Sequence, residues 1–184
     1  EAGLTSEIIE QKQPAFCIFE FIYVGRPDSR FLGVNISGFR KRTGQELARE
    51  EKDENFQVPP DSITIPMPNT AHPAGVAWAW EMGIPPEFGC IKDRYNPERT
   101  FIMPEQRARV SGVNAFTIIP EVVEDKIVYM VDDSIVRGTT KQGIVRRLLN
   151  SGAREIHGRI TSPPYRFPCV YGIDMQTKNE FIAR

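Results

Sequence analysis

Two patterns of apolar residues alternate along the chain. Short runs rich in β-branched residues predict buried strands, at Ser62 to Met67, Ile127 to Val131 and Arg154 to Ile160. Longer segments with apolar residues at helical spacing predict helices, at Gly33 to Glu51, Ala74 to Met82 and Lys141 to Asn150. The second helix is expected to be mostly buried, because it carries Val76, Trp78 and Trp80. Alternating strands and helices are typical of an α/β fold with a parallel sheet.

A long polar segment interrupts this alternation. Asp93 to Glu105 contains two prolines and follows neither the strand nor the helix period, so it predicts a loop. A short helix is expected to follow at Glu105 to Ser111. Long loops in compact domains are commonly lids or binding loops.

The residues that could bind a ligand are concentrated directly after the predicted strand that begins at Ile127. Asp132 and Asp133 fall at its carboxyl end, the edge of an open α/β sheet at which ligands bind. Arg137 to Thr140 then precede a helix, whose first N–H groups lack partners and favour a phosphate. Gly138 can adopt backbone angles that other residues avoid, and the spacing is not that of a Walker loop. In the alternative interpretation, the segment is an Asx-type turn with a threonine cap, and the acids are only solvated.

The composition of the chain limits the classes of partner that are expected. The chain has 184 residues, a length that suits one domain, and 40% of them are hydrophobic. The formal net charge is −1, which argues against nucleic acid or a membrane surface as the main partner. No apolar run approaches the roughly 18 residues of a membrane span, so a cytoplasmic location is the default expectation.

Val131 to Thr140, Val-Asp-Asp-Ser-Ile-Val-Arg-Gly-Thr-Thr, closely resembles the phosphoribosyl pyrophosphate (PRPP) signature of type I phosphoribosyltransferases, in the form found in amidophosphoribosyltransferases. Three further blocks look like the same family and occur in family order: Phe16 to Ser29, Ile91 to Ile102 and Ser162 to Asp174. The resemblance therefore spans nearly the whole chain.

This resemblance implies the type I phosphoribosyltransferase fold, in which helices flank a parallel sheet that carries a small hood. Residues 1–184 would form a single phosphoribosyltransferase domain. The amino-terminal glutaminase domain and the carboxyl-terminal tail of the family are expected to be absent. We also expect a homo-oligomer.

The resemblance also implies roles for residues. The loop that starts at Ser134 would hold the 5-phosphate of PRPP, and the two acids would bind the ribose hydroxyls. The implied PRPP-binding residues are Asp132, Asp133, Ser134, Arg137, Gly138, Thr139 and Thr140. The loop after Ile91 matches the flexible loop that orders over PRPP, where cations stabilise the departing pyrophosphate and exclude water. Its catalytic residues would be Lys92, Arg94, Tyr95 and Arg99; the alternative is an exposed charged loop without a ligand.

Two departures from the family pattern affect the pyrophosphate site. The family usually has Pro-Asp-Ser-Gly where this chain has Pro68-Asn69-Thr70-Ala71. Asn69 removes a charge, and Ala71 replaces a glycine at a position expected to need unusual backbone angles. Thr70 keeps a hydroxyl for Mg²⁺ or phosphate, so the implied metal ligands are Thr70, Asp132 and Asp133. Gly112 to Pro120 contains no Lys or Arg, which lowers the local positive charge.

The three cysteines, Cys17, Cys90 and Cys169, form no Cys-x-x-Cys pair, so their spacing favours buried apolar residues or free thiols. Cys17 and Cys169 lie where the iron–sulfur branch of the family places two of its four ligands. Two thiolates cannot complete a Cys₄ site, so a [4Fe–4S] cluster is expected only in a longer parent protein.

These observations favour an enzyme that transfers phosphoribosyl from PRPP, with Mg²⁺, to ammonia. It would release pyrophosphate and form 5-phosphoribosylamine for purine biosynthesis. The ammonia would be free or would come from a glutaminase domain or subunit. One alternative is a PRPP-binding regulatory or sensor module with weakened catalysis, which the two departures favour. Another is a nucleobase-salvage phosphoribosyltransferase, which shares the signature and the fold.

Overall fold

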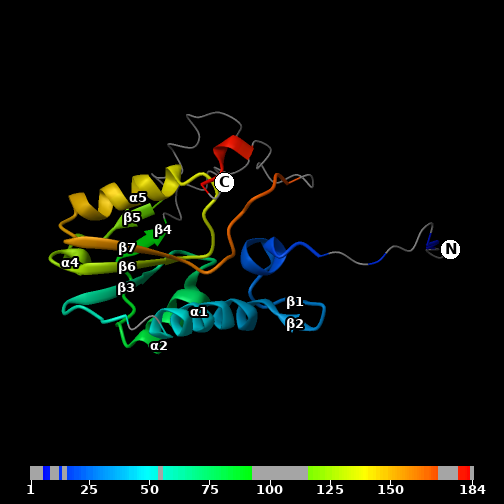
Figure 1. Cartoon of the computed structure of the whole chain (residues 1–184), viewed down its shortest axis with the longest axis horizontal. Helices are drawn as coiled ribbons and strands as arrows, with labels where there is room; N and C mark the ends of the chain where they lie inside the picture. The colour runs from blue at the N-terminus through cyan, green and yellow to red at the C-terminus, as the bar shows by residue number, and fades with distance from the viewer. Residues whose placement is uncertain are drawn as a thin grey trace, which may run out of the picture.

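A parallel three-stranded sheet forms the centre of the protein (Figure 1). The computed structural model describes residues 6–8, 13, 16–53, 56–92, 116–169 and 178–182. The strand order is β3-β6-β7, with β3 at Ser62–Pro66, β6 at Ile127–Asp132 and β7 at Glu155–Ile160. Pro66 lies opposite Val131, and Asp132 lies opposite Ile160. The carboxyl ends of β3 and β6 therefore meet at one edge.

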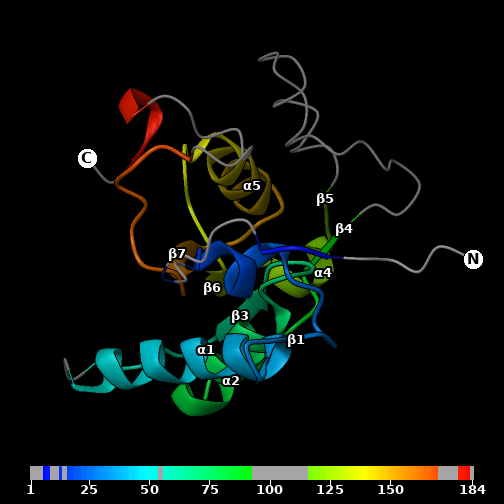
Figure 2. The ribbon, with the colours of Figure 1, turned by 90° about the vertical axis from the view of Figure 1, so that its right-hand side faces the viewer.

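Helices cover both faces of this sheet (Figure 2). The helices are α1 at Ile36–Asp53, α2 at His72–Met82 and α5 at Thr139–Asn150. All six residues of β6 are buried, and successive side chains point to opposite faces. Ile127, Tyr129 and Val131 pack in one core cluster with Trp78 of α2. Val128 and Met130 belong to a second cluster, which includes residues of α5. A continuous apolar strand is expected where both faces of a parallel sheet are covered.

Shorter elements surround this core. A π-helix, η1, spans Glu20–Val24, and a hairpin pairs β1 at Arg30–Phe31 with β2 at Val34–Asn35. An antiparallel pair joins β4 at Cys90–Lys92 to β5 at Phe116–Ile118. The remaining elements are α4 at Pro120–Val123 and the 3₁₀ helix η2 at Lys178–Glu180.

The predicted strands and helices are confirmed, with shifted ends. The largest shift is in α1, which begins at Ile36 and not at Gly33. Gly33 has a φ of 77° and lies in the turn between β1 and β2, so the hairpin occupies the first residues of the predicted helix. The burial of α2 is confirmed for Trp78 and wrong for Trp80, whose exposed fraction is 77%. The predicted loop at 93–105 and helix at 105–111 lie outside the described residues.

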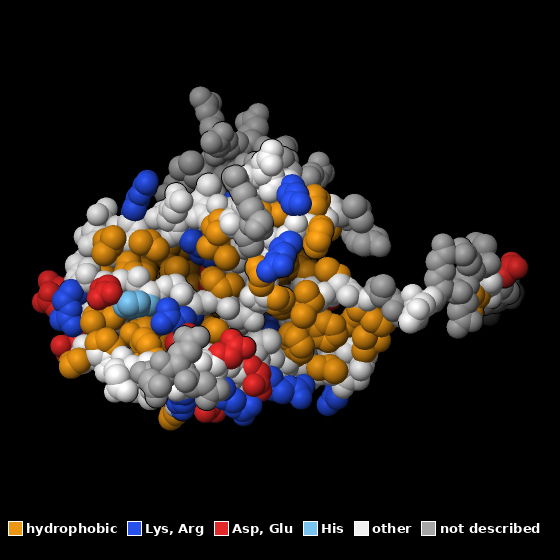
Figure 3. Space-filling view, in the orientation of Figure 1, with side chains coloured by type: hydrophobic (Ala, Val, Ile, Leu, Met, Phe, Trp, Pro, Cys, Tyr) orange, Lys and Arg blue, Asp and Glu red, His pale blue; other side chains and the backbone are white. Residues whose placement is uncertain are grey.

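Hydrophobic side chains gather on the surface over η1 and the β1–β2 hairpin (Figure 3). Phe31 makes edge-to-face contacts with Phe16 and Phe21, and Phe21 also contacts Phe39 of α1. These rings attach the amino-terminal segment to the rest of the domain. Within the described ranges, none of the helices combines the length and the apolar content that a membrane span requires.

Candidate functional site at the carboxyl ends of β3 and β6

Residues from two separate loops meet at this edge of the sheet. The N–H of Met67 donates to the carbonyl of Val131 at 2.8 Å, which extends the β3–β6 pairing beyond the last residue of β3. The loop after β3 therefore starts beside the loop after β6. Thr70 Oγ1 donates a hydrogen bond to Asp133 Oδ2. The structure thus brings the predicted pyrophosphate loop and the predicted diacid together.

Asp133 is a buried carboxylate held by hydroxyl groups. Its exposed fraction is 4%, and Ser134 Oγ donates to its Oδ1 at 2.6 Å. Burial raises the pKa of Asp133, while the hydroxyls of Ser134 and Thr70 and the charge of Arg40 oppose that rise. An acid that accepts two hydroxyl donors in this way is suited to bind the hydroxyls of a ligand.

Asp132 is held differently, although it is the adjacent residue. Its Oδ1 accepts the N–H of Asp133 at 2.8 Å. Its Oδ2 is ion-paired with Lys141 Nζ, from the first turn of α5. Burial lowers the pKa of Lys141 to about 8. The sequence prediction used Lys141 only as the start of a helix and missed this contact.

The loop from Ser134 to Gly138 leads into the amino terminus of α5. Gly138 is the N-cap residue, with a φ of 78°, which confirms that a glycine is needed there. Thr139 is exposed and Thr140 is half-buried. The alternative interpretation is wrong about the threonine cap and about the solvated acids. The cap residue is Gly138 and not a threonine, and both acids are buried instead of solvated.

The predicted pyrophosphate loop differs from the sequence-based expectation in its backbone. Ala71 is fully buried, with φ −83° and ψ −7° at the start of α2. Its φ is negative, which any L-residue can adopt, so Ala71 itself needs no left-handed backbone. The peptide bond between Pro68 and Asn69 is cis.

The sequence prediction also missed three residues around Asp133. Arg40 of α1 is one, and its Nε and Nη2 donate to the carbonyls of Phe21 and Gly25, both at 2.9 Å. The others are Tyr23 and Tyr165, whose pKa values are raised by burial first and also by the charge of Asp133; that of Tyr165 reaches about 12. Both tyrosines lie in blocks that resemble the family, which was the available signal.

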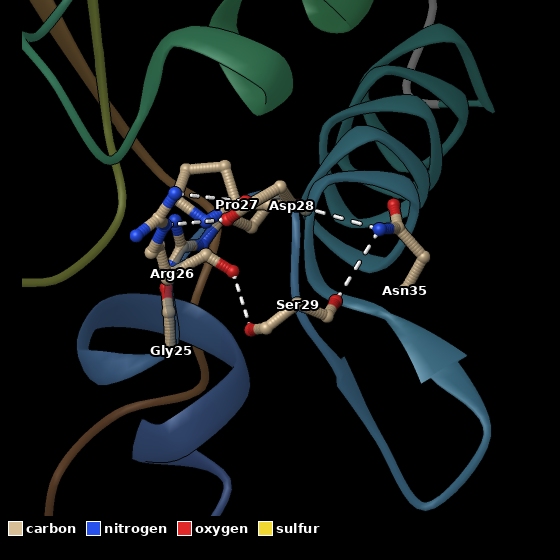
Figure 4. Close-up of polar contacts among 7 residues, drawn as sticks. Gly25, Arg26, Pro27, Asp28, Ser29 and Asn35 are labelled. Carbon is tan, nitrogen blue, oxygen red and sulfur yellow. Dashed lines mark hydrogen bonds and ion pairs between the residues drawn. The ribbon is translucent and has the colours of Figure 1, made fainter.

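A turn after η1 orders the backbone next to Arg40 (Figure 4). Ser29 Oγ donates to the carbonyl of Arg26 at 2.6 Å, and Asn35 Nδ2 donates to the carbonyls of Pro27 and Ser29 at 3.4 and 3.3 Å. Arg26 also pairs with Asp28 at 2.8 Å, on the exposed side. The first family-like block therefore orders the backbone that Arg40 contacts.

Comparisons with known proteins agree with this geometry. No protein-family model matches the sequence. The amidophosphoribosyltransferase of Pyrococcus horikoshii is 43% identical over 178 residues, which are 97% of this chain and 38% of that protein. The Bacillus subtilis amidophosphoribosyltransferase is 45% identical over 185 residues, 100% of this chain and 37% of that protein. The resemblance to amidophosphoribosyltransferases is confirmed.

A solved structure supports the same assignment. The Bacillus subtilis glutamine PRPP amidotransferase, solved in complex with ADP and GMP, has a TM-score of 0.72 and 46% sequence identity. The match covers 91% of this chain and 35% of that chain. The fold is that of the type I phosphoribosyltransferases. The chain spans somewhat more than a third of the length of its amidophosphoribosyltransferase relatives.

The predicted catalytic loop is only partly described. Lys92 is exposed at the end of β4, whereas Arg94, Tyr95 and Arg99 lie outside the described residues. Lys92 lies opposite Phe116 in the β4–β5 pair, so the two ends of segment 93–115 are held together.

The two cysteines that match the iron–sulfur branch of amidophosphoribosyltransferases lie on segments that meet. Phe19 and Tyr165 make an edge-to-face contact, with ring centroids 5.6 Å apart. Cys17 is exposed and Cys169 is half-exposed. Among the described residues, no group of three or more Cys, His, Asp or Glu side chains could hold a metal ion.

The donor set of the diacid site fits Mg²⁺, which takes one or two carboxylates and completes its shell with water and phosphate oxygens. Thr70, Asp132 and Asp133 would supply oxygen atoms only, and the contact between Thr70 and Asp133 keeps two of these groups together. A separate surface groove of about 910 Å³ lies beside α1 and α2. Its lining includes His72 and Trp80 but neither acid.

Proposed function

We propose that this chain is the phosphoribosyltransferase part of an amidophosphoribosyltransferase. It would transfer phosphoribosyl from PRPP to ammonia, release pyrophosphate and form 5-phosphoribosylamine for purine biosynthesis. The observation that carries the proposal is the hydrogen bond from Thr70 to Asp133, because it joins the two loops that must hold opposite ends of PRPP. The names of the relatives support this reaction and do not favour nucleobase salvage.

The binding mode follows from the arrangement of the two loops. The N–H groups at the start of α5, with Ser134, Arg137, Gly138, Thr139 and Thr140, hold the 5-phosphate. Asp132 and Asp133 accept hydrogen bonds from the ribose hydroxyls. Asn69, Thr70 and Ala71 lie by the pyrophosphate, and Mg²⁺ bound by Thr70 and the two acids would neutralise part of its charge.

The transfer step requires little acid or base catalysis from the protein. Unprotonated ammonia is already a nucleophile, so no strong base is required before it attacks C1 of the ribose. The main contributions are the position of the two reactants and the stabilisation of charge on the departing pyrophosphate. Lys92, Arg94, Tyr95 and Arg99 supply that stabilisation from the loop after β4. The ammonia is free or comes from a glutaminase domain or subunit. The protein would act as a homo-oligomer in the cytoplasm.

Ammonium-dependent release of pyrophosphate tests this function. The reaction contains PRPP, Mg²⁺ and ammonium at alkaline pH, where more of the ammonium is unprotonated, with a blank that lacks ammonium. Asp132→Asn should lower the rate roughly 100-fold, comparable to the loss of one charge-stabilising contact. Asp61→Asn is the matched control, because Asp61 is an exposed acid just before β3, at the opposite end of the sheet.

The possible outcomes separate the proposed function from its main alternative. The expected result is ammonium-dependent release that Asp132→Asn lowers roughly 100-fold and Asp61→Asn leaves unchanged. Saturable PRPP binding without any release would contradict the transferase and favour a sensor module.

A further inference from the structure

Lys141 occupies a position that is unfavourable for a lysine. It is the third residue of α5, within the first turn, where the helix dipole disfavours a cation. Its side chain is also largely buried, with an exposed fraction of 21%. A charged lysine in such a place requires an anion nearby.

Asp132 is that anion. Its Oδ2 is ion-paired with Lys141 Nζ, its Oδ1 accepts the N–H of Asp133, and the exposed fraction of its side chain is 6%. The Cys90 thiol also lies near Lys141, but burial raises its pKa to about 11, so it is uncharged at neutral pH. The protein therefore places one of its own groups against each oxygen of Asp132, a backbone N–H at Oδ1 and an ammonium at Oδ2, although the ammonium contact lacks hydrogen-bond geometry.

Asp133 contrasts with its neighbour. Within the described part of the chain, its oxygens accept hydrogen bonds from the hydroxyls of Thr70 and Ser134, and a hydroxyl can turn to contact a ligand. Arg40 lies close enough to influence Asp133, but its described hydrogen bonds go to backbone carbonyls. Asp132 is thus paired with a lysine ammonium, whereas Asp133 is held by hydroxyls, with Arg40 as a nearby charge.

We propose that Lys141 is a positioning residue that acts as the internal counter-ion of Asp132. It fixes the orientation of the carboxylate and competes with a divalent cation for Oδ2. The free protein then binds Mg²⁺ weakly, and Asp133 is the acid that meets the metal first. The inference rests on the proposed function for the identity of the metal, but binding of metal to the free protein can be measured without any turnover.

The test measures Mn²⁺ binding to the PRPP-free protein, from the electron paramagnetic resonance signal of unbound Mn²⁺. Lys141→Met removes the ammonium and keeps an unbranched side chain, so it should tighten Mn²⁺ binding about tenfold, as expected when one repelling charge is removed near a cation. Lys141→Arg keeps the positive charge and should bind Mn²⁺ within about twofold of the wild type. Lys126→Met is the matched control, because Lys126 pairs with Asp61 at the opposite end of β6, and it should not change binding.

A folded Lys141→Met variant that binds Mn²⁺ no more tightly than the wild type would overturn the proposal. A measurement on the wild type covers the case in which this variant does not fold. Amine acetylation read by mass spectrometry should increase at Lys141 when Mn²⁺ is added, relative to Lys126, because the metal displaces the ammonium from Asp132. Equal acetylation of Lys141 with and without saturating Mn²⁺ would also overturn it. Neither result depends on pyrophosphate release, so this inference and the proposed function can fail separately.

Discussion

Replacement of Gly138 by alanine should damage both stability and PRPP binding. Gly138 has a φ of 78°, and an L-residue in left-handed backbone costs about 1–2 kcal/mol. A Cβ atom at this position would lie 2.4 Å from Ile182 Cδ1. Ile182 is 54% exposed, so the end of its side chain can move away, and the steric contribution should stay below about 1 kcal/mol.

Two other glycines separate these contributions. Gly83→Ala has the same type of strain, since Gly83 has a φ of 71° and a Cβ there would meet nothing within 4 Å. Gly158→Ala has neither problem, because a Cβ there is also free and its backbone is not left-handed. We expect free energies of unfolding to fall by about 1–2 kcal/mol for Gly83→Ala, slightly more for Gly138→Ala, and by less than about 0.5 kcal/mol for Gly158→Ala.

Chemical denaturation measures these differences, and calorimetric titration with PRPP and Mg²⁺ measures binding. Each kcal/mol should lower the melting temperature by roughly 2–4 °C in a protein of this size. Only Gly138→Ala should weaken PRPP binding, by at least about tenfold, because only Gly138 shapes the phosphate loop. The reasoning would be refuted if Gly138→Ala matched Gly158→Ala in stability, or if Gly83→Ala weakened binding equally.

Two further predictions concern the core. The pKa of Cys90 is raised from 9.0 to about 11, so its contribution to stability is complete below pH 9 and is lost as the pH rises through 11. Relative to Cys90→Ala, the wild type should lose about 1 kcal/mol by pH 10 in denaturant titrations. A gain in the stability of the wild type relative to Cys90→Ala over this pH range would contradict the burial of Cys90. Leu148→Ala should lower the free energy of unfolding by about 2–5 kcal/mol, because Leu148 is fully buried. Leu149 is 47% exposed, so Leu149→Ala should lower it by less than about 0.5 kcal/mol. Equal losses in denaturant titrations would contradict the buried face of α5.

The sequence predicted a strand or helix well where the environment of that element leaves a clear pattern of apolar residues. The run Ile127 to Val131 of β6 was recognisable because both faces of a parallel strand are covered, which favours apolar residues at successive positions. Helical spacing could not show that Trp80 points to solvent while Trp78 is buried. The α2 helix is apolar on most sides, so spacing alone does not identify its buried face.

The candidate site was predictable in its loops but not in its contacts. Asp132, Asp133 and Gly138 belong to one contiguous segment, and the sequence identified all three. The ion pair to Asp132 was missed because Lys141 reaches back from the following helix, which a linear pattern does not reveal. Arg40 was missed because it comes from a helix far away in the sequence, and its described hydrogen bonds go to backbone carbonyls of Phe21 and Gly25.

Calorimetric titration of the protein with PRPP in the presence of Mg²⁺ shows whether the PRPP site exists. We expect saturable binding at one site per chain, at least about tenfold weaker in Asp132→Asn and unchanged in Asp61→Asn. The absence of saturable binding by the folded wild type, or equal affinity in both variants, would contradict a PRPP site at the carboxyl ends of β3 and β6.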